Sequence, residues 1–147
     1  MKRPFACPFF VRQGGGAAVE FALVLPILLT LLFGILEYGW YFTQQIVLIN
    51  AVQQGARTAS RMMREDDQSM EKYESSIRSV AIETVSKNYW FGSLVNVDAK
   101  PEYDDKLGIP EAIVVWVSDQ PFKPLTGYLP DAMVPSRMGA RSKMVLP

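Results

Sequence analysis

The feature that most constrains this chain is an uncharged apolar run near its N-terminus, residues 21–36, which lies between Glu20 and Glu37. As an α-helix this run is about 24 Å long at 1.5 Å per residue, whereas the hydrocarbon core of a bilayer is about 30 Å thick. We therefore expect a membrane-spanning helix that continues past Glu37 and covers about residues 20–42. Beside the outer interface, Glu37 either snorkels to the surface or pairs with another subunit. Four aromatic residues are expected to form a belt at that interface: Tyr38, Trp40, Tyr41 and Phe42.

Basic residues predict the orientation of this helix. Lys2, Arg3 and Arg12 precede the apolar run, and the next basic residue after it is Arg57. Because positively charged flanks stay in the cytoplasm, the N-terminus is expected there and the bulk of the chain outside the cytoplasm. The single cysteine, Cys7, precedes the run, so the part beyond the membrane must be held together by packing rather than by disulfides.

A glycine run and a carboxylate stand at the start of the apolar helix. A charge within the hydrocarbon layer costs about 2.5 to 3.5 kcal/mol, so Glu20 needs a partner or a place at the interface. Glycines lie extended in a peptidase active site at low steric cost. A cut between Gly15 and Gly16 creates an α-ammonium that a neighbouring subunit's Glu20 can neutralise. Without such a cut, Glu20 is an ordinary interfacial carboxylate.

Residues 12–61 combine these features with others in a recognisable order. The pattern consists of Glu20-Phe21 after the glycines, Pro26 inside the apolar run, Glu37-Tyr38, and Gly55-Ala56-Arg57. In these positions the segment resembles the TadE family of minor pseudopilins, which belong to the Flp (tight adherence) type IV pilus systems of bacteria. Residues 115–125 resemble the family's C-terminal strand and Pro-Phe turn more weakly.

The resemblance implies a location, a processing event and a set of partners. A prepilin peptidase would cut at Gly15 and Gly16, so that residues 1–15 are a leader, while Glu20, Phe21 and Glu37 serve assembly. The partners implied are other pseudopilins, the Flp pilin, the Tad inner-membrane assembly platform and membrane lipid. The protein would reside in the bacterial inner membrane, with a periplasmic or extracellular domain, and can enter the pilus itself.

Two other interpretations of the N-terminus are weaker. A cleaved secretory signal needs small residues after the apolar run, but residues 34–40 contain a charge and bulky aromatic side chains. A lipoprotein would need an apolar segment before Cys7, and only six residues precede it.

The remaining chain predicts an α+β, pilin-like domain. Apolar residues at spacings of three and four continue the first helix from about Ala17 to Met63, with the buried stripe Ile49, Val52, Ala56, Ala59 and Met63. The domain proper, residues 64–147, begins with a polar cluster, Glu65, Asp66, Asp67, Gln68 and Ser69, that supplies N-cap candidates for a second amphipathic helix. Its expected stripe is Met70, Tyr73, Ile77, Val80 or Ala81, and Thr84. Alternation predicts strands near residues 95–99, 112–117 and 138–144, with a hairpin loop over residues 101–110 and a basic edge strand at the end. The sheet is expected to be antiparallel, with about three strands.

Composition argues against an enzyme. The chain has no histidine, and the region after Cys7 has no cysteine, which removes the usual thiol, imidazole and transition-metal chemistry. We therefore assign no catalytic, cofactor-binding or metal-binding residues. A calcium site at residues 65–67 lacks the ligand spacing of a calcium loop. Fifteen basic residues balance 15 acidic ones with no basic face, so no nucleic-acid partner is expected.

One alternative function remains at this stage. The chain can be a membrane-anchored extracytoplasmic binding module, in which Trp116, Phe122 and Tyr128 line a ligand surface and the first helix is only a tether.

Overall fold

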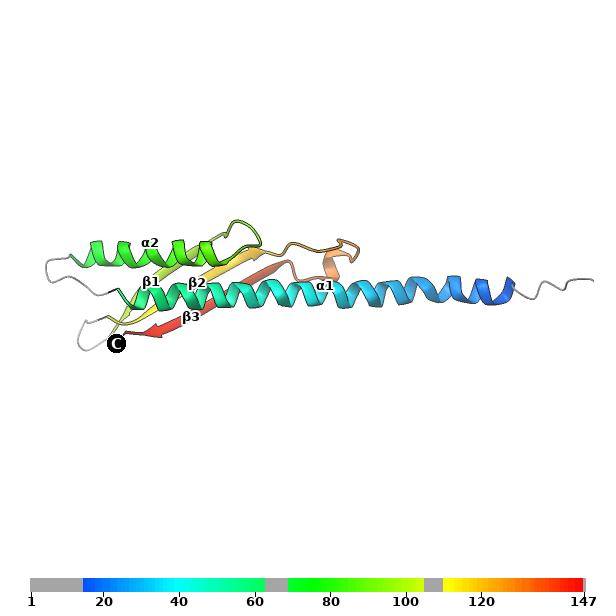
Figure 1. The fold of residues 1–147 in the computed structure, drawn as a ribbon, viewed down its shortest axis with the longest axis horizontal. Helices are drawn as coiled ribbons and strands as arrows, with labels where there is room; N and C mark the ends of the chain where they lie inside the picture. Colours follow the sequence, from blue (N-terminus) through cyan, green and yellow to red (C-terminus); the bar gives the residue numbers. More distant parts are fainter. Residues whose placement is uncertain (1–14, 63–68, 105–109, 147) are drawn as a thin grey trace, which may run out of the picture.

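The computed structural model describes residues 15–62, 69–104 and 110–146 and confirms the α+β architecture. The elements are helices α1 (Gly15–Ser60) and α2 (Met70–Asn88), strands β1 (Val97–Tyr103) and β2 (Pro110–Pro121), the short 3-10 helix η1 (Asp131–Met133) and strand β3 (Arg137–Val145). The strands form one antiparallel sheet in the order β1-β2-β3. In Figure 1 the second half of α1 carries the domain, while its first half extends away from it.

Helix α1 runs for 46 residues without a break, although Pro26 lies inside it. It is long and apolar enough to cross a membrane, and none of its most apolar 18-residue window is buried in the chain. The helix ends at Ser60, slightly before the predicted end at Met63, which lies outside the described residues. The expected single helix through both the apolar and the amphipathic region is therefore confirmed.

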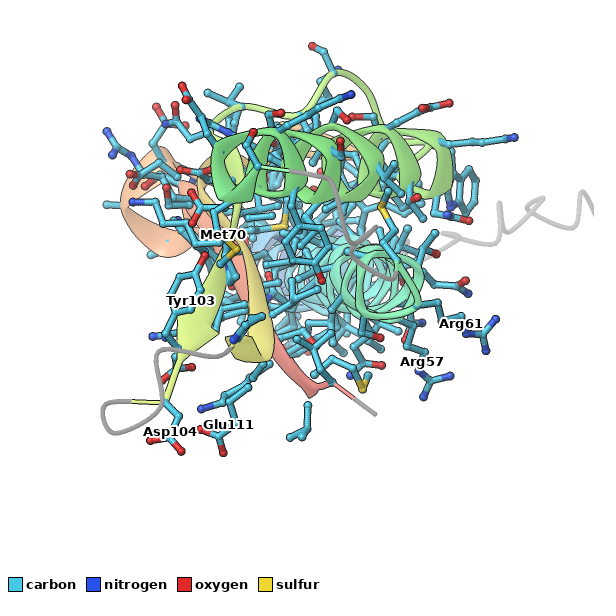
Figure 2. The ribbon with its side chains drawn as sticks, turned by 90° about the vertical axis from the view of Figure 1, so that its left-hand side faces the viewer. Arg57, Arg61, Met70, Tyr103, Asp104 and Glu111 are labelled. Carbon is cyan, nitrogen blue, oxygen red and sulfur yellow. The ribbon has the colours of Figure 1, made fainter. Side chains whose placement is uncertain are left out.

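The buried face of α1 is rotated slightly from the predicted stripe. Val52, Ala56 and Ala59 are fully buried as expected, but Ile49 is 37% exposed and Leu48 is buried in its place. The reason is that α2 and the sheet both contact α1, so the buried face is set by two neighbours rather than one. Figure 2, which looks along α1, shows Arg57 and Arg61 pointing away from both.

Helix α2 packs closely on α1 at a glycine. A Cβ built on Gly55 would lie 2.4 Å from Val85 Cγ2 and 3.2 Å from the Ala81 carbonyl oxygen. The predicted stripe is right at Tyr73 and Ile77, which are buried. Of the two alternatives at the next position, Ala81 is buried and Val80 is not. The prediction of Thr84 is wrong, because Val85 is the buried residue there.

The start of α2 is capped by one of the predicted residues. Ser69 accepts a hydrogen bond from the Lys72 backbone N–H in its N-cap position. The other cap candidates, residues 65–68, lie outside the described residues.

The sheet extends further than the alternation predicted. β1 starts at Val97 and continues through Pro101 to Tyr103, and β2 already begins at Pro110, so the predicted loop 101–110 is wrong at both ends. Pro101 is tolerated in β1 because β1 is an edge strand, and an N–H on the open side of an edge strand makes no hydrogen bond to another strand. Residues 105–109 lie outside the described part of the chain.

The third strand is an edge strand as predicted. β3 pairs with β2, and its basic residues point outward. Arg137 lies 2.9 Å from Asp119, and Lys143 lies 2.8 Å from Glu102. The core between the helices and the inner face of the sheet includes Leu48, Val52, Ala56, Tyr73, Ile77, Val85, Ile113, Val115 and Val117.

Candidate functional site

The predicted processing site forms the first turn of α1. Gly15 and Gly16 are both helical, and no atom lies within 4 Å of a Cβ built on either residue. The sequence predicted a helix starting near Ala17, so the helix begins slightly earlier than expected. An extended conformation at the cut would require this first turn to open, which helix ends do readily.

The first carboxylate of α1, Glu20, faces outward with its neighbour Phe21. Both side chains are exposed, and among the described residues Glu20 has no hydrogen-bond or ion-pair partner. The part of the chain that the structure describes therefore gives this carboxylate no partner.

The second carboxylate, Glu37, contacts the segment that joins β2 to β3. We call residues 122–135, which join β2 to β3, the collar segment. In Figure 1 this orange part of the chain, which includes η1, lies against α1 beyond the end of the sheet. It contacts α1 in the region that the sequence placed at the outer membrane interface.

Glu37 binds the collar segment through three hydrogen bonds. Its side chain is 1% exposed. One oxygen, Oε1, accepts from the Leu125 backbone N–H at 2.7 Å, and Oε2 accepts from the Thr126 N–H at 3.0 Å and its hydroxyl at 2.7 Å. A buried carboxylate is stabilised only when such donors replace water. In this structure Glu37 is bound by its own chain, whereas the sequence predicted that it snorkels to the interface or pairs with another subunit.

Further contacts fasten the collar segment to α1. The Lys123 carbonyl oxygen accepts from Trp40 Nε1 at 3.1 Å and from Gln44 Nε2 at 2.8 Å. The Tyr38 hydroxyl donates to the Met133 carbonyl oxygen at 2.7 Å. Together with the bonds of Glu37, these contacts span residues 37–44, about two turns of α1. The collar segment is therefore fixed along the helix rather than at a single point.

With this geometry established, the chain can be compared with known proteins. Residues 15–57 match the family model described as TadE-like protein. The match lies within α1 and includes both carboxylates and Gly55-Ala56-Arg57. No curated protein and no solved structure matches the chain. The match confirms, over these residues, the resemblance seen in the sequence.

The four aromatic residues of the predicted belt on α1 lie in different environments. Phe42 is 58% exposed and Tyr38 is 43% exposed, so both can face lipid. Trp40 instead packs edge-on against Phe91, with ring centroids 5.2 Å apart, and Tyr41 packs against Phe122 at 5.5 Å. Since the Tyr38 hydroxyl also donates to Met133, three of the four aromatic residues contact the domain and only Phe42 is left to the lipid alone.

Several residues that contact Glu37 or the collar segment were not predicted from the sequence. Thr126 and Leu125 bind Glu37, and Gln44 binds Lys123, although neither pairing has a local sequence signal. One feature of the sequence pointed to such a contact. Glu37 interrupts an apolar helix, so its carboxylate requires hydrogen-bond donors, and the collar segment has polar residues between its prolines.

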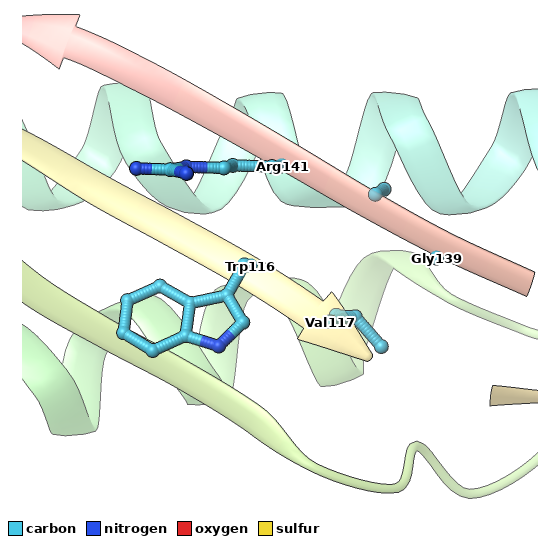
Figure 3. Close-up of a pocket in the computed structure, with 5 residues that line it drawn as sticks. Trp116, Val117, Gly139 and Arg141 are labelled. Carbon is cyan, nitrogen blue, oxygen red and sulfur yellow. The ribbon is translucent and has the colours of Figure 1, made fainter. Parts of the chain in front are cut away.

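The aromatic residues of the alternative binding module do not share one cavity. Trp116 lines a hollow of about 520 Å³ on β2 and β3 with Val117, Gly139, Ala140 and Arg141, shown in Figure 3. Phe122 lines a separate hollow with Glu37. Tyr128 packs against Phe33 of α1 with the two rings tilted and their centroids 4.6 Å apart. Within the described residues, no cluster of three or more acidic, histidine or cysteine side chains is placed to hold a metal.

Proposed function

We propose that the protein is a TadE-like minor pseudopilin that acts in the assembly of a Flp/Tad adhesive pilus. It is inserted in the bacterial inner membrane with its N-terminus in the cytoplasm and its α+β domain outside. A prepilin peptidase removes residues 1–15, and the mature chain joins other pseudopilins and the Flp pilin at the Tad assembly platform. The role is structural, with no catalysis.

The observation that carries this proposal is the contrast between the two carboxylates of α1. Glu37 is buried and satisfied by its own chain, whereas Glu20 is exposed and has no partner among the described residues. An unpaired charge at the start of a membrane helix is costly, so its retention favours a partner outside the chain. The α-ammonium of a neighbouring processed subunit has the required charge and can lie at the same depth.

The glycines support the proposed cut by a similar argument. Gly at a helix position costs about 0.5 to 1 kcal/mol relative to Ala. Because no described atom lies within 4 Å of a Cβ built on Gly15 or Gly16, packing among the described residues gives no reason for either glycine. A peptidase that accepts only a small residue before the cut supplies such a reason.

The direct test is the intact mass of the protein extracted from membranes. Loss of residues 1–15 is the expected result. An unprocessed N-terminus would support a tethered domain instead, although the structure does not gather the side chains that a ligand surface was expected to use.

A further inference from the structure

The membrane-proximal end of the domain presents an exposed apolar face. Leu125, Tyr128 and Met133 of the collar segment are each more than half exposed. Beside them is a hollow of about 490 Å³ with almost entirely apolar walls, lined by Thr30, Leu31, Gly34, Ile35, Tyr38, Leu129 and Met133. An exposed apolar surface of this kind marks a site that contacts a membrane, another protein or an apolar ligand.

The position of this face along α1 identifies its partner. A hydrocarbon core of about 30 Å corresponds to about 20 helical residues. Counted from Glu20, where the predicted span begins, these end at Gly39, next to Tyr38 of the hollow. The apolar face of the collar segment is therefore continuous with the lipid-facing side of the membrane span, none of whose most apolar window is buried in the chain.

The polar groups of the collar segment suit a position at the boundary of the bilayer. Several of its backbone groups are paired within the chain: Glu37 accepts from the N–H groups of Leu125 and Thr126, and the Met133 N–H donates to the Pro130 carbonyl at 2.8 Å. Prolines in the segment have no N–H to satisfy. Its exposed charges, Lys123 and Asp131, exclude the hydrocarbon itself but fit the headgroup layer.

A second segment brings a tryptophan toward the same end of the domain. Trp90, just after α2, is 73% exposed and stacks on Phe91 with ring centroids 4.6 Å apart. Phe91 in turn contacts Trp40, which places Trp90 near the helix turn that follows the membrane span. Tryptophan is enriched at this depth of a bilayer because its ring is apolar and its N–H is polar.

We propose that the collar segment and Trp90 form a lipid-binding face that rests in the headgroup and upper acyl region of the leaflet on the domain's side. The partner is bilayer lipid. The face fixes the height and tilt of the domain over the membrane, because Glu37, Trp40 and Gln44 hold the collar segment rigidly to α1. This inference rests on the membrane anchoring in the proposed function and not on the pilus role.

Spin labels on the full-length chain test the depth of this face. In a Cys7→Ser background, single cysteines are introduced at Met133, at Leu28 as the membrane reference, and at Glu111, at the opposite end of the sheet, as the water reference. Each labelled protein is reconstituted in phosphatidylethanolamine–phosphatidylglycerol vesicles, and the label's accessibility to oxygen and to a water-soluble nickel chelate is measured. All three side chains are exposed, so the fold should tolerate the labels.

We expect the oxygen-to-nickel ratio at position 133 to be several-fold above that at 111 and below that at 28. A ratio equal to that at 111 would overturn the inference while leaving the anchor in place. Low accessibility to both reagents would mean that protein, such as a second copy, covers the face, which also overturns it. If position 28 itself behaves as in water, the anchoring fails and the inference fails with it.

Fluorescence provides an independent measurement at Trp90. A variant that keeps only Trp90 (W40F, W116F) should be quenched by brominated lipids. The matched variant that keeps only Trp116 (W40F, W90F) should not be, because Trp116 lies on the sheet. Equal quenching of the two would contradict the proposed depth.

Discussion

The carboxylate of Glu37 accepts hydrogen bonds from both the backbone N–H and the hydroxyl of Thr126, a residue 89 positions later in the chain. This contact joins the membrane helix to the connection between the last two strands. Together with the bonds of Tyr38, Trp40 and Gln44, it holds the collar segment on α1. An interruption of the apolar run thus has a structural purpose inside the chain.

Replacing Glu37 tests the strength of this contact. Glu37→Gln should lower the free energy of unfolding of the domain by about 2 to 3 kcal/mol, since the charge is lost and one acceptor oxygen becomes an NH2 donor that faces the donors of the collar segment. Thermal unfolding of the full chain in detergent measures the change. The matched variant Glu20→Gln should unfold like the wild type, because Glu20 has no partner among the described residues. Equal unfolding temperatures for the two variants would contradict the role assigned to Glu37.

The sequence predicted the elements of this fold much better than the contacts between them. Periodicity found α1, α2 and β3 because each buries one face, and that pattern is local. It misplaced Ile49 and the loop at residues 101–110, because the exact buried face and the length of a paired strand depend on neighbours. The Glu37 contact with Leu125 and Thr126 joins residues nearly 90 positions apart, which no local pattern reports.

Gly55 should be among the least replaceable positions of the domain. Gly55→Ala places a Cβ 2.4 Å from Val85 Cγ2, so α1 and α2 must move apart. Overpacking of this kind costs about 1 to 3 kcal/mol. Gly39→Ala is the control, since a Cβ there meets nothing within 4 Å, and it should be neutral or slightly stabilising. Unfolding in detergent compares them, and Val85→Ala should recover part of the loss if the clash is its cause.

Processing should depend on the residue before the proposed cut. Gly15→Leu should leave the unprocessed precursor in the membrane, because a bulky side chain should not fit where glycine does. Gly34→Leu changes another glycine of α1 with no neighbour near its Cβ, and it should still be processed. The masses of the two membrane-extracted variants give the answer. A Gly15→Leu protein of normal mature mass would mean that the cut lies elsewhere.

The orientation in the membrane should follow the basic residues. A reporter that is active only outside the cytoplasm should work when fused after Pro147 and should be inactive when fused after Arg12. Reporter activity in cells measures both fusions. The opposite result would place the domain in the cytoplasm and remove the pseudopilin proposal.

The role of Glu20 can be separated from membrane insertion. Glu20→Ala removes a costly charge beside an untouched apolar run, so the variant should insert at least as well as the wild type. Pilus assembly should nevertheless fail, because the α-ammonium of a neighbouring subunit loses its counter-charge in a setting of low dielectric constant. Leu23→Ala provides the matched control, since it truncates another exposed side chain of α1 without removing charge. Processing is measured by mass in both variants, so that a failure to cut is not mistaken for a failure to assemble. If cells whose only copy is Glu20→Ala make normal numbers of pili, Glu20 is an ordinary interfacial carboxylate and the assembly role assigned to it is wrong.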